Sequence, residues 1–136
     1  MQNNFSILAI DPGRSKWGWA VVTNQNVVVA HSIDRFEELI VRVAKLHKEH
    51  SFNSIILGNL TGSKEYYRCL STNFSHLAIE FIDEANSTLE ARKVYFEFNP
   101  PKGVWRLIPL SFQSPSEDYD DYTAIVLARR YLKGSE

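Results

Sequence analysis

Three short apolar runs separated by tight turns open the chain, and this spacing constrains the fold more than any other feature. The runs cover 5–10, 17–23 and 27–31, with Pro12-Gly13 in the first turn and Asn24-Gln25-Asn26 in the second. Turns this short join neighbouring antiparallel strands, because a parallel pair needs a crossover of about a dozen residues or more. The sequence therefore begins with a predicted three-stranded antiparallel meander.

After the third run, helical and strand-like patterns alternate. Predicted helices cover 34–50, a segment from the loop 59–62 to about 70–74, 87–96 and 116–132; predicted strands cover 54–58 and 77–82. The helix at 87–96 begins with Ser87-Thr88-Leu89-Glu90, which is typical of a capping box. The proline-rich segment 101–115 is expected to be an ordered loop or an irregular edge.

This order predicts an α/β protein in which two later strands lie parallel to the first and helices flank the sheet. Such a five-stranded mixed sheet, three antiparallel strands followed by two parallel ones, is of the ribonuclease H type. With 136 residues, 44% hydrophobic and 23% charged, residues 1–136 are expected to form a single domain.

Composition excludes several classes of protein. Cys69 is the single cysteine, so no internal disulfide can form. The first residues lack the basic start of a signal peptide, and no apolar segment approaches the ~20 residues that span a bilayer. We therefore expect a cytoplasmic protein without membrane contact. A net charge of −1 argues against coating nucleic acid by bulk electrostatics, although a local binding site is compatible with it.

Three acids fall at element ends that this fold would bring to one rim of the sheet: Asp11 after the first strand, Glu84 after the fifth, and Asp121 near the start of the last helix. Carboxylate oxygens are the hard ligands that Mg2+ and Mn2+ take, and a pair of such ions is what phosphodiester hydrolysis uses. No histidines and cysteines have zinc-ligand spacing.

Each acid also has a purely structural interpretation. Asp11 and Glu84 could be turn formers, and acids are favoured at the start of any helix. In the last helix, Asp120 and Asp121 each head a largely apolar row, so helical geometry alone leaves open which of them faces the sheet. A supporting role for Asp118 or Asp120 beside Asp121 is likewise open.

Four blocks in a fixed order span nearly the whole chain. They are 7–13 with Lys16, Gly18 and Ala20; 55–60 with Gly62-Ser63; 81–84 with Ser87-Thr88 and Glu90-Ala91; and Asp121 with Ala124 and Leu127. Together they resemble the YqgF (RuvX) family, which has a ribonuclease H-like fold and is described as a Holliday-junction resolvase or as a nuclease that matures the 5′ end of 16S ribosomal RNA. The first block is shared with RuvC-type resolvases and, loosely, with actin-like ATPases, whose nucleotide cleft needs two such domains.

The resemblance implies that Asp11, Glu84 and Asp121 are the catalytic and metal-binding residues. It also implies that Lys16 and the loop from Gly58 to Ser63, including Asn59, lie near the substrate backbone. We further expect Arg14 or Arg92 to steady phosphates.

The chain departs from the family pattern in three places. Ala85 stands where a basic residue usually follows the Asp-Glu pair, and the segment 99–115 is not typical of the family. A RuvC-like enzyme would carry a glutamate at the end of the fourth strand, where this chain has Gly58-Asn59. Glu84 is therefore expected to reach inward from one strand further out.

The leading hypothesis is a hydrolase: an Mg2+- or Mn2+-dependent endonuclease acting on structured RNA or branched DNA, as monomer or homodimer. Its proposed roles would be precursor 16S rRNA processing in ribosome biogenesis, or resolution of Holliday junctions. The alternative is a catalytically inactive nucleic-acid-binding module of the same fold. Exposed tryptophans among Trp17, Trp19 and Trp105 could stack on bases, although burial in the core is the commoner fate of this side chain.

Overall fold

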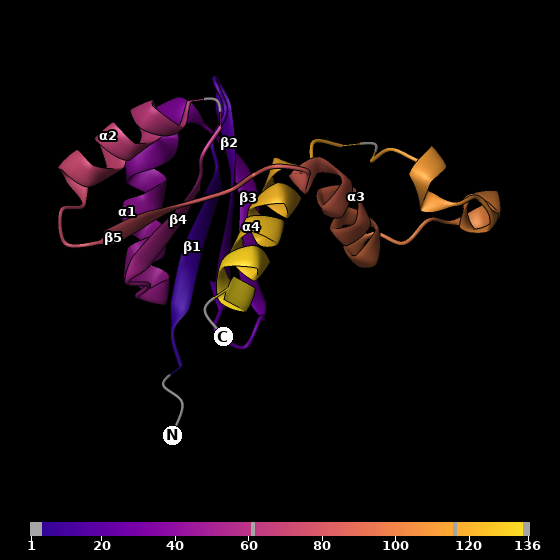
Figure 1. Ribbon diagram of the computed structural model, residues 1–136, viewed down its shortest axis with the longest axis horizontal. Helices are drawn as coiled ribbons and strands as arrows, with labels where there is room; N and C mark the ends of the chain where they lie inside the picture. Colours follow the sequence, from indigo (N-terminus) through magenta and orange to yellow (C-terminus); the bar gives the residue numbers. More distant parts are fainter. Residues whose placement is uncertain (1–3, 61, 116, 135–136) are drawn as a thin grey trace.

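A five-stranded sheet forms the centre of the molecule in a computed structural model that describes residues 4–60, 62–115 and 117–134 (Figure 1). The strands are β1 (Ser6–Asp11), β2 (Lys16–Thr23), β3 (Val28–Arg35), β4 (Ser54–Gly58) and β5 (Ala78–Ile82). Their spatial order is β3-β2-β1-β4-β5. β1 pairs antiparallel with β2, and β2 with β3, whereas β4 is parallel to β1 and to β5. The predicted mixed sheet is confirmed.

Four α-helices accompany the sheet, in the predicted order along the chain. They are α1 (Leu39–His50), α2 (Ser63–Asn73), α3 (Ser87–Phe98) and α4 (Asp120–Gly134). Short 3-10 helices lie at Phe36–Glu38, Gly103–Leu107 and Leu110–Phe112. No helix in the described ranges is both long enough and apolar enough to cross a membrane.

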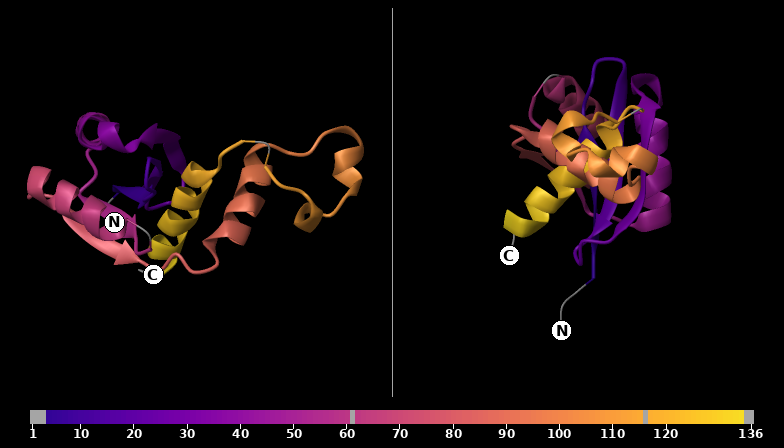
Figure 2. Two further views of the ribbon diagram at one scale, coloured as in Figure 1. Left: turned by 90° about the horizontal axis from the view of Figure 1, so that it is seen from above. Right: turned by 90° about the vertical axis from the view of Figure 1, so that its right-hand side faces the viewer.

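The three central strands, β1, β2 and β4, are buried on both sides because helices cover both faces of the sheet (Figure 2). Leu8 and Ile10 of β1 point to the face packed by α1 and α2, where the fully buried Trp17 also lies. Ile7 and Ala9 point to the opposite face and contact the buried side of α4. This alternation follows from the two-residue repeat of a strand, and it explains why the first predicted runs carry so few polar residues.

α4 lies very close to β2, and a glycine makes this possible. A Cβ atom at Gly18 would overlap the carbonyl group of Asp120, so any larger residue would push the start of the helix away. Gly18 is also the residue that pairs with Asp11 across β1 and β2. The beginning of α4 is therefore placed beside the end of β1.

Two local predictions, the end of the third strand and the capping box, are wrong. β3 continues to Arg35 instead of ending at His31, because β2 is long enough to pair with all of it and the indole N–H groups of Trp17 and Trp19 donate to Arg35 O and Asp34 Oδ2. The capping box at Ser87 is not formed: Asn86 is the N-cap residue and makes no side-chain capping bond. Glu90 instead accepts hydrogen bonds from Arg130 on α4.

The last helix begins later than predicted. Ser116, its predicted first residue, lies outside the described residues. The helix starts at Asp120, since the carbonyl of Tyr119 accepts the first hydrogen bonds, from the amides of Tyr122 and Thr123. The preceding Asp118 pairs with Lys16 instead of joining the helix.

The segment 99–115, named the arm below, extends away from the sheet beyond α3 (Figures 1 and 2). It is an ordered loop with two 3-10 turns and is not an edge of the sheet. Of the three tryptophans, Trp17 and Trp19 are buried in the core, whereas Trp105 on the arm is about half exposed.

Candidate active site

Two acids from separate strands meet at the rim of the sheet. Asp11 is the last residue of β1, and Glu84 follows the end of β5 by two residues. β4 lies between these strands and ends at Gly58. A Cβ atom at Gly58 would overlap Cδ of Glu84, so the glutamate side chain occupies the space that the glycine leaves empty. Glu84 thus reaches inward across one strand, as the sequence analysis expected, and the two carboxyl groups share a hydrogen bond.

The loop after β4 fixes the position of Glu84. The backbone amide of Leu60 donates to Glu84 Oε2 at 2.9 Å, and the amide of Glu84 donates to Asn59 Oδ1 at 3.3 Å. The amide of Asn59 in turn donates to Ile82 O at 3.1 Å, which ties the loop to the end of β5. Only 6% of Glu84 is exposed. A buried carboxylate with this many fixed contacts is held in one orientation.

The turn after Asp11 is held from the opposite side by α2. The hydroxyl of Tyr66 donates to Gly13 O at 2.6 Å and accepts from Gly13 N at 3.3 Å. Burial, the largest cause, raises the pKa of Tyr66 to about 12, so its hydroxyl stays protonated and able to donate. These bonds fix the backbone two residues beyond Asp11.

The pKa of the Asp11 carboxyl is raised far above the ordinary value of an aspartate. Burial raises its pKa to about 9, with further contributions from the hydrogen bond to Glu84 and from the charges of Glu84 and Asp120. A hydrogen bond between two carboxyl groups requires one proton between them. Two acids that share one proton in a confined space form a site where added positive charge is favourable.

Asp120, the first residue of α4, is the third acid of this site. Its charge acts on Asp11, and burial raises its own pKa, an effect that Lys16 opposes. Lys16 Nζ lies 3.6 Å from Asp120 Oδ2 and 2.5 Å from Asp118 Oδ2. The lysine thus bridges the two acids at the edge of the site.

These side chains open into a cleft of about 380 Å³. Besides the three acids it is lined by residues from the turn after β1, the start of α3 and the start of α4: Pro12, Leu60, Ala85, Asn86, Ser87, Thr88, Tyr119 and Thr123. The cleft therefore lies at the rim where the carboxyl ends of the parallel strands meet.

The expected convergence needs one correction, which concerns Asp121. Its Oδ2 atom lies 2.7 Å from Nδ1 of His31 on β3, while its buried Oδ1 has no partner among the described residues. It lines a separate pocket of about 240 Å³ with Ser32, Asp118 and Tyr122. Successive helical residues project about 100° apart, so α4 cannot turn Asp120 and Asp121 toward the same point.

The predicted substrate-binding residues are distributed unevenly. Lys16 and Asn59 lie beside the acids, but Asn59 supports Glu84 and Lys16 is paired with acids. Ser63 is buried at the start of α2. Arg14 is exposed in the turn after β1, and Arg92 on α3 has a buried Nε without a partner in the described ranges. Neither arginine lines the cleft.

The cleft is also lined by three residues that were not predicted as site residues from the sequence: Thr88, Tyr119 and Thr123. Thr88 belongs to a block that resembles a known family, so that signal was available. For Tyr119 and Thr123 no signal existed, because their position depends on where α4 begins.

The donor set partly fits a divalent cation. Asp11 and Glu84 are hydrogen-bonded carboxyls with hard oxygen donors, and Asp120 supplies a further carboxylate within range of their charge. Within 4–60, 62–115 and 117–134, no group of three acidic, histidine or cysteine side chains is arranged to hold a metal ion. Asp11 and Glu84 are thus in contact with each other. Asp120 could act as a third ligand only by giving up its ion pair with Lys16.

Comparison with solved structures places the architecture. The chain is similar to the structure of RuvC from Thermus thermophilus, with a TM-score of 0.53 and 9% identity over 96% of this chain and 98% of RuvC. It is also similar to a ROK family protein from Streptococcus pneumoniae (TM-score 0.45, 15% identity, 66% of this chain) and to a Ppx/GppA family member from Aquifex aeolicus (0.41, 10%, 70%).

The chain spans only 38% and 39% of the length of the latter two proteins. No protein-family profile matches the sequence, and no curated protein matches it either. The RuvC similarity extends over almost the whole length of both chains. The protein has a ribonuclease H-like fold.

Proposed function

We propose that the protein is a metal-dependent endonuclease that hydrolyses phosphodiester bonds in structured nucleic acid. The observation that carries this proposal is the carboxyl pair of Asp11 and Glu84, which come from the ends of two strands and share one hydrogen bond at the rim of the sheet. A pair that binds a proton so tightly has a strong tendency to bind a cation in its place.

Asp11, Glu84 and Asp120 would hold Mg2+ or Mn2+. When bound by such carboxylates, these ions supply a hydroxide nucleophile and stabilise the oxygen that leaves phosphorus. The remaining residues have supporting roles: Leu60 and Asn59 orient Glu84 through their hydrogen bonds. Lys16, which now pairs with Asp118 and Asp120, becomes available to a substrate phosphate once a cation takes Asp120.

The finer assignment is a divergent branch of the YqgF (RuvX) family. It is supported by the four sequence blocks and by the way Glu84 replaces a glutamate at the end of β4. The corresponding substrates would be precursor 16S rRNA or a four-way DNA junction. A cleft open to solvent at the sheet rim accommodates a phosphate backbone from either nucleic acid.

Cleavage of both substrates tests the proposal. Labelled precursor rRNA and a labelled four-way junction are incubated with the protein and Mn2+, and products are resolved on denaturing gels. We expect cutting of at least one substrate, lost in Asp11→Asn and retained in Glu37→Gln, an exposed acid that does not line the cleft. Equal cutting by the parent and Asp11→Asn in Mn2+ would contradict the assignment.

A second candidate is an inactive module that binds nucleic acid with the same fold. The pairing of Asp120 with Lys16 favours it, because this contact withholds a ligand from the site, and so does Ala85 in place of a basic residue. Isothermal titration with Mn2+ separates the two candidates. An endonuclease binds the ion in a manner that depends on Asp11, whereas an inactive module shows no such binding.

A further inference from the structure

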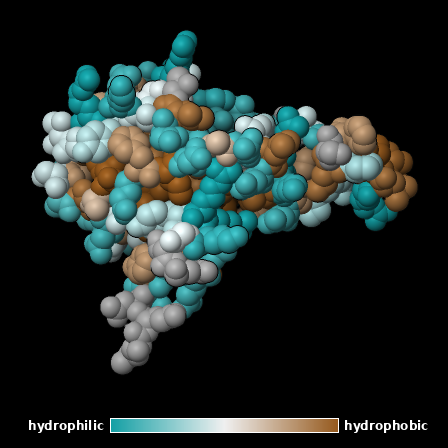
Figure 3. Space-filling view, in the orientation of Figure 1, coloured by the Kyte–Doolittle hydropathy of each residue, from teal (hydrophilic) through white to brown (hydrophobic). Residues whose placement is uncertain are grey.

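The arm carries a chemical character unlike the rest of the protein. Between Glu97 and Glu117 the sequence contains no acidic residue, but it contains Lys102 and Arg106. Large apolar side chains are exposed along it: Val104 (71% exposed), Trp105 (54%), Leu107 (85%), Leu110 (40%) and Phe112 (78%). Figure 3 shows the tip of the arm as a hydrophobic surface at the end of an otherwise mostly hydrophilic face. Contiguous exposed apolar patches on a protein surface mark binding sites.

The arm has a defined shape in spite of its exposure. Gln113 is buried, and its Nε2 donates to Trp105 O at 2.9 Å and to Ile108 O at 2.7 Å, which closes the two 3-10 turns on each other. At the base of the arm, Asn99 Nδ2 donates to the hydroxyl of Tyr122 on α4 at 3.0 Å. The aromatic side chains are therefore presented from a built structure.

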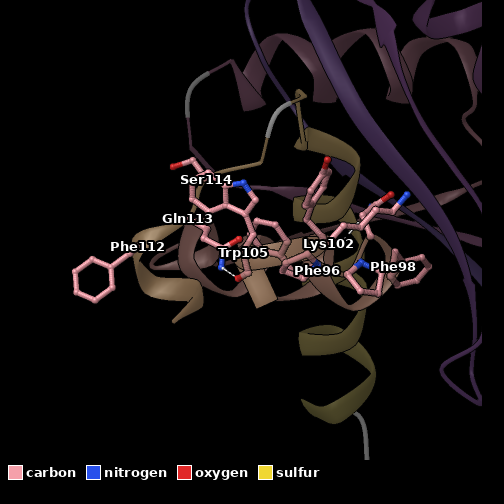
Figure 4. A pocket seen from close by; sticks show the side chains of 11 residues that line it. Phe96, Phe98, Lys102, Trp105, Phe112, Gln113 and Ser114 are labelled. Atoms are coloured by element: carbon pink, nitrogen blue, oxygen red, sulfur yellow. Dashed lines mark hydrogen bonds between the residues drawn. The ribbon is translucent and has the colours of Figure 1, made fainter. Parts of the chain in front are cut away.

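A groove of about 1010 Å³ lies between the arm and the end of α3. Figure 4 shows the side chains that line it. Five of these residues are aromatic: Tyr95, Phe96, Phe98, Trp105 and Phe112. Among the described lining residues, Lys102 is the only one with a charged side chain. Trp105 stands over the groove, and Phe112 points outward from the tip. Flat rings beside a cation, without an acid, are the combination that binds unpaired bases and their phosphates.

Charge decides between the two classes of partner that aromatic surfaces attract. In a two-fold contact between copies of this chain, the arm of one copy would face the arm of the other. Lys102 and Arg106 of one copy would then lie near the same two cations of the second copy, and the arm offers no acid to pair with them. A nucleic acid strand provides the phosphates that these cations lack. A duplex keeps its bases stacked on each other, so the rings favour an unpaired strand.

The arm is also connected to the cleft. Its C-terminal end lies five positions before Asp120, and its base is bonded to Tyr122 in the first turn of α4. A strand that follows the arm to its base would therefore reach the start of α4, where Asp120 lies.

We propose that the arm binds an unpaired segment of nucleic acid, with bases stacked on Trp105 and Phe112 and phosphates on Lys102 and Arg106. This inference rests on the proposed function in one respect: that the nucleic acid bound by the arm is also the substrate that is cut in the cleft. It assigns to the enzyme a substrate in which a single-stranded segment adjoins the bond that is cut.

Fluorescence anisotropy in EDTA tests the arm without cleavage. The probes are a labelled single strand of about 20 nucleotides, longer than the site of one binding domain, and a blunt duplex of equal length. We expect the protein to prefer the single strand, and Trp105→Ala/Phe112→Ala to weaken that binding about 10-fold or more. The matched control is Val104→Ala/Leu107→Ala, which removes equally exposed aliphatic side chains from the same arm and should bind as the parent does.

A charge variant and a rescue variant sharpen the test. Lys102→Gln/Arg106→Gln should flatten the dependence of the logarithm of affinity on the logarithm of salt concentration by about 1–2. Trp105→Tyr should restore binding relative to Trp105→Ala, since stacking needs a ring. The inference is overturned if the aromatic and aliphatic double variants bind alike, or if the duplex binds as tightly as the strand.

Two further outcomes separate this inference from the proposed function. If Trp105→Ala/Phe112→Ala binds the strand normally but turns a dimer into a monomer in sedimentation, the arm is a contact between copies and the inference is wrong. If the strand binds through Trp105 but no substrate is cut in Mn2+, the proposed function fails and the arm assignment stands.

Discussion

The side chain of Glu84 fills the space that Gly58 leaves empty at the end of β4. Any side chain at position 58 would therefore collide with Glu84. A Cβ atom at Gly58 would overlap Cδ of Glu84 and lie 2.6 Å from its Oε1. The acid therefore reaches Asp11 across β4 instead of growing from β4 itself.

Gly58→Ala should destabilise the protein and stop cleavage. The added methyl group has to displace Glu84 from a packed site, which costs about 1–3 kcal/mol of unfolding free energy. In the background of Glu84→Ala the obstacle is absent, so the cost of Gly58→Ala should fall below about 1 kcal/mol, and a double-mutant cycle by urea unfolding measures the difference. Gly134→Ala, at a position with open space, is the control. An equal cost of Gly58→Ala in both backgrounds would show that the two positions are independent.

Asp11→Asn should stabilise the cation-free protein at neutral pH. The pKa of Asp11 is raised to about 9 in the folded state, above the ordinary value of 3.8, so the folded state binds more protons than the unfolded state between these values. The parent's free energy of unfolding therefore falls as pH rises through this window, whereas the asparagine variant lacks that loss. The advantage should be small near pH 4 and reach at least about 1 kcal/mol at pH 8, a few degrees in Tm.

Thermal unfolding in EDTA from pH 4 to pH 9 measures this effect, with Glu37→Gln as a control for loss of an exposed charge. Adding Mn2+ should raise the Tm of the parent and leave that of Asp11→Asn unchanged, since binding to the folded state alone adds stability. A Tm difference between the two proteins that is constant with pH would show that Asp11 titrates normally.

How far the sequence predicts this site differs from residue to residue. Asp11 is predictable because an apolar run followed by an acid and Pro-Gly is a local pattern. The inward reach of Glu84 was expected because Gly58-Asn59 stands where a RuvC-like enzyme would carry a glutamate. The choice between Asp120 and Asp121 is not local. Both head apolar rows of α4, and the choice is made by the close approach of the helix to Gly18, a contact between residues about 100 positions apart.

The same distinction holds for the fold. The strand order is predictable because turn lengths and alternating helices restrict it. The length of β3 is not, since residues 32–35 have no strong strand pattern of their own and are held by pairing with β2 and by the indole groups of Trp17 and Trp19. The 3-10 turns of the arm were not predicted either, because they depend on one side chain, Gln113, which bonds to the carbonyls of Trp105 and Ile108.

Asp120→Asn and Asp121→Asn form a matched pair that identifies the third acid. Loss of a carboxylate that meets the reacting centre should reduce cleavage at least about 100-fold, and we expect this from Asp120→Asn with little change in stability. Asp121→Asn should instead lower stability, because it weakens the pair with His31 while cleavage by the folded protein stays within about tenfold. Initial rates in Mn2+ with urea unfolding measure both effects. The reverse pattern would restore Asp121 as the ligand that the family resemblance implies.

Tyr66→Phe should impair catalysis through the backbone beside Asp11. The substitution removes the hydroxyl that donates to Gly13 O and accepts from Gly13 N, so both backbone groups lose a partner at a site where Tyr66 is fully buried. We expect a cost of about 1–2 kcal/mol in unfolding free energy. Because the turn then moves relative to Glu84, kcat should fall while KM changes little.

This deficit should not depend on pH between 5 and 9. The pKa of Tyr66 is raised to about 12, and an unfolded tyrosine titrates near its ordinary value of 10.0, so the hydroxyl is protonated in both states throughout that range. Tyr67→Phe is the control, since the ring of Tyr67 is exposed and lies against Phe81. Unfolding curves and steady-state rates at several pH values check the prediction, and a Tyr66→Phe protein as stable and active as Tyr67→Phe would show that the turn holds Asp11 without help from α2.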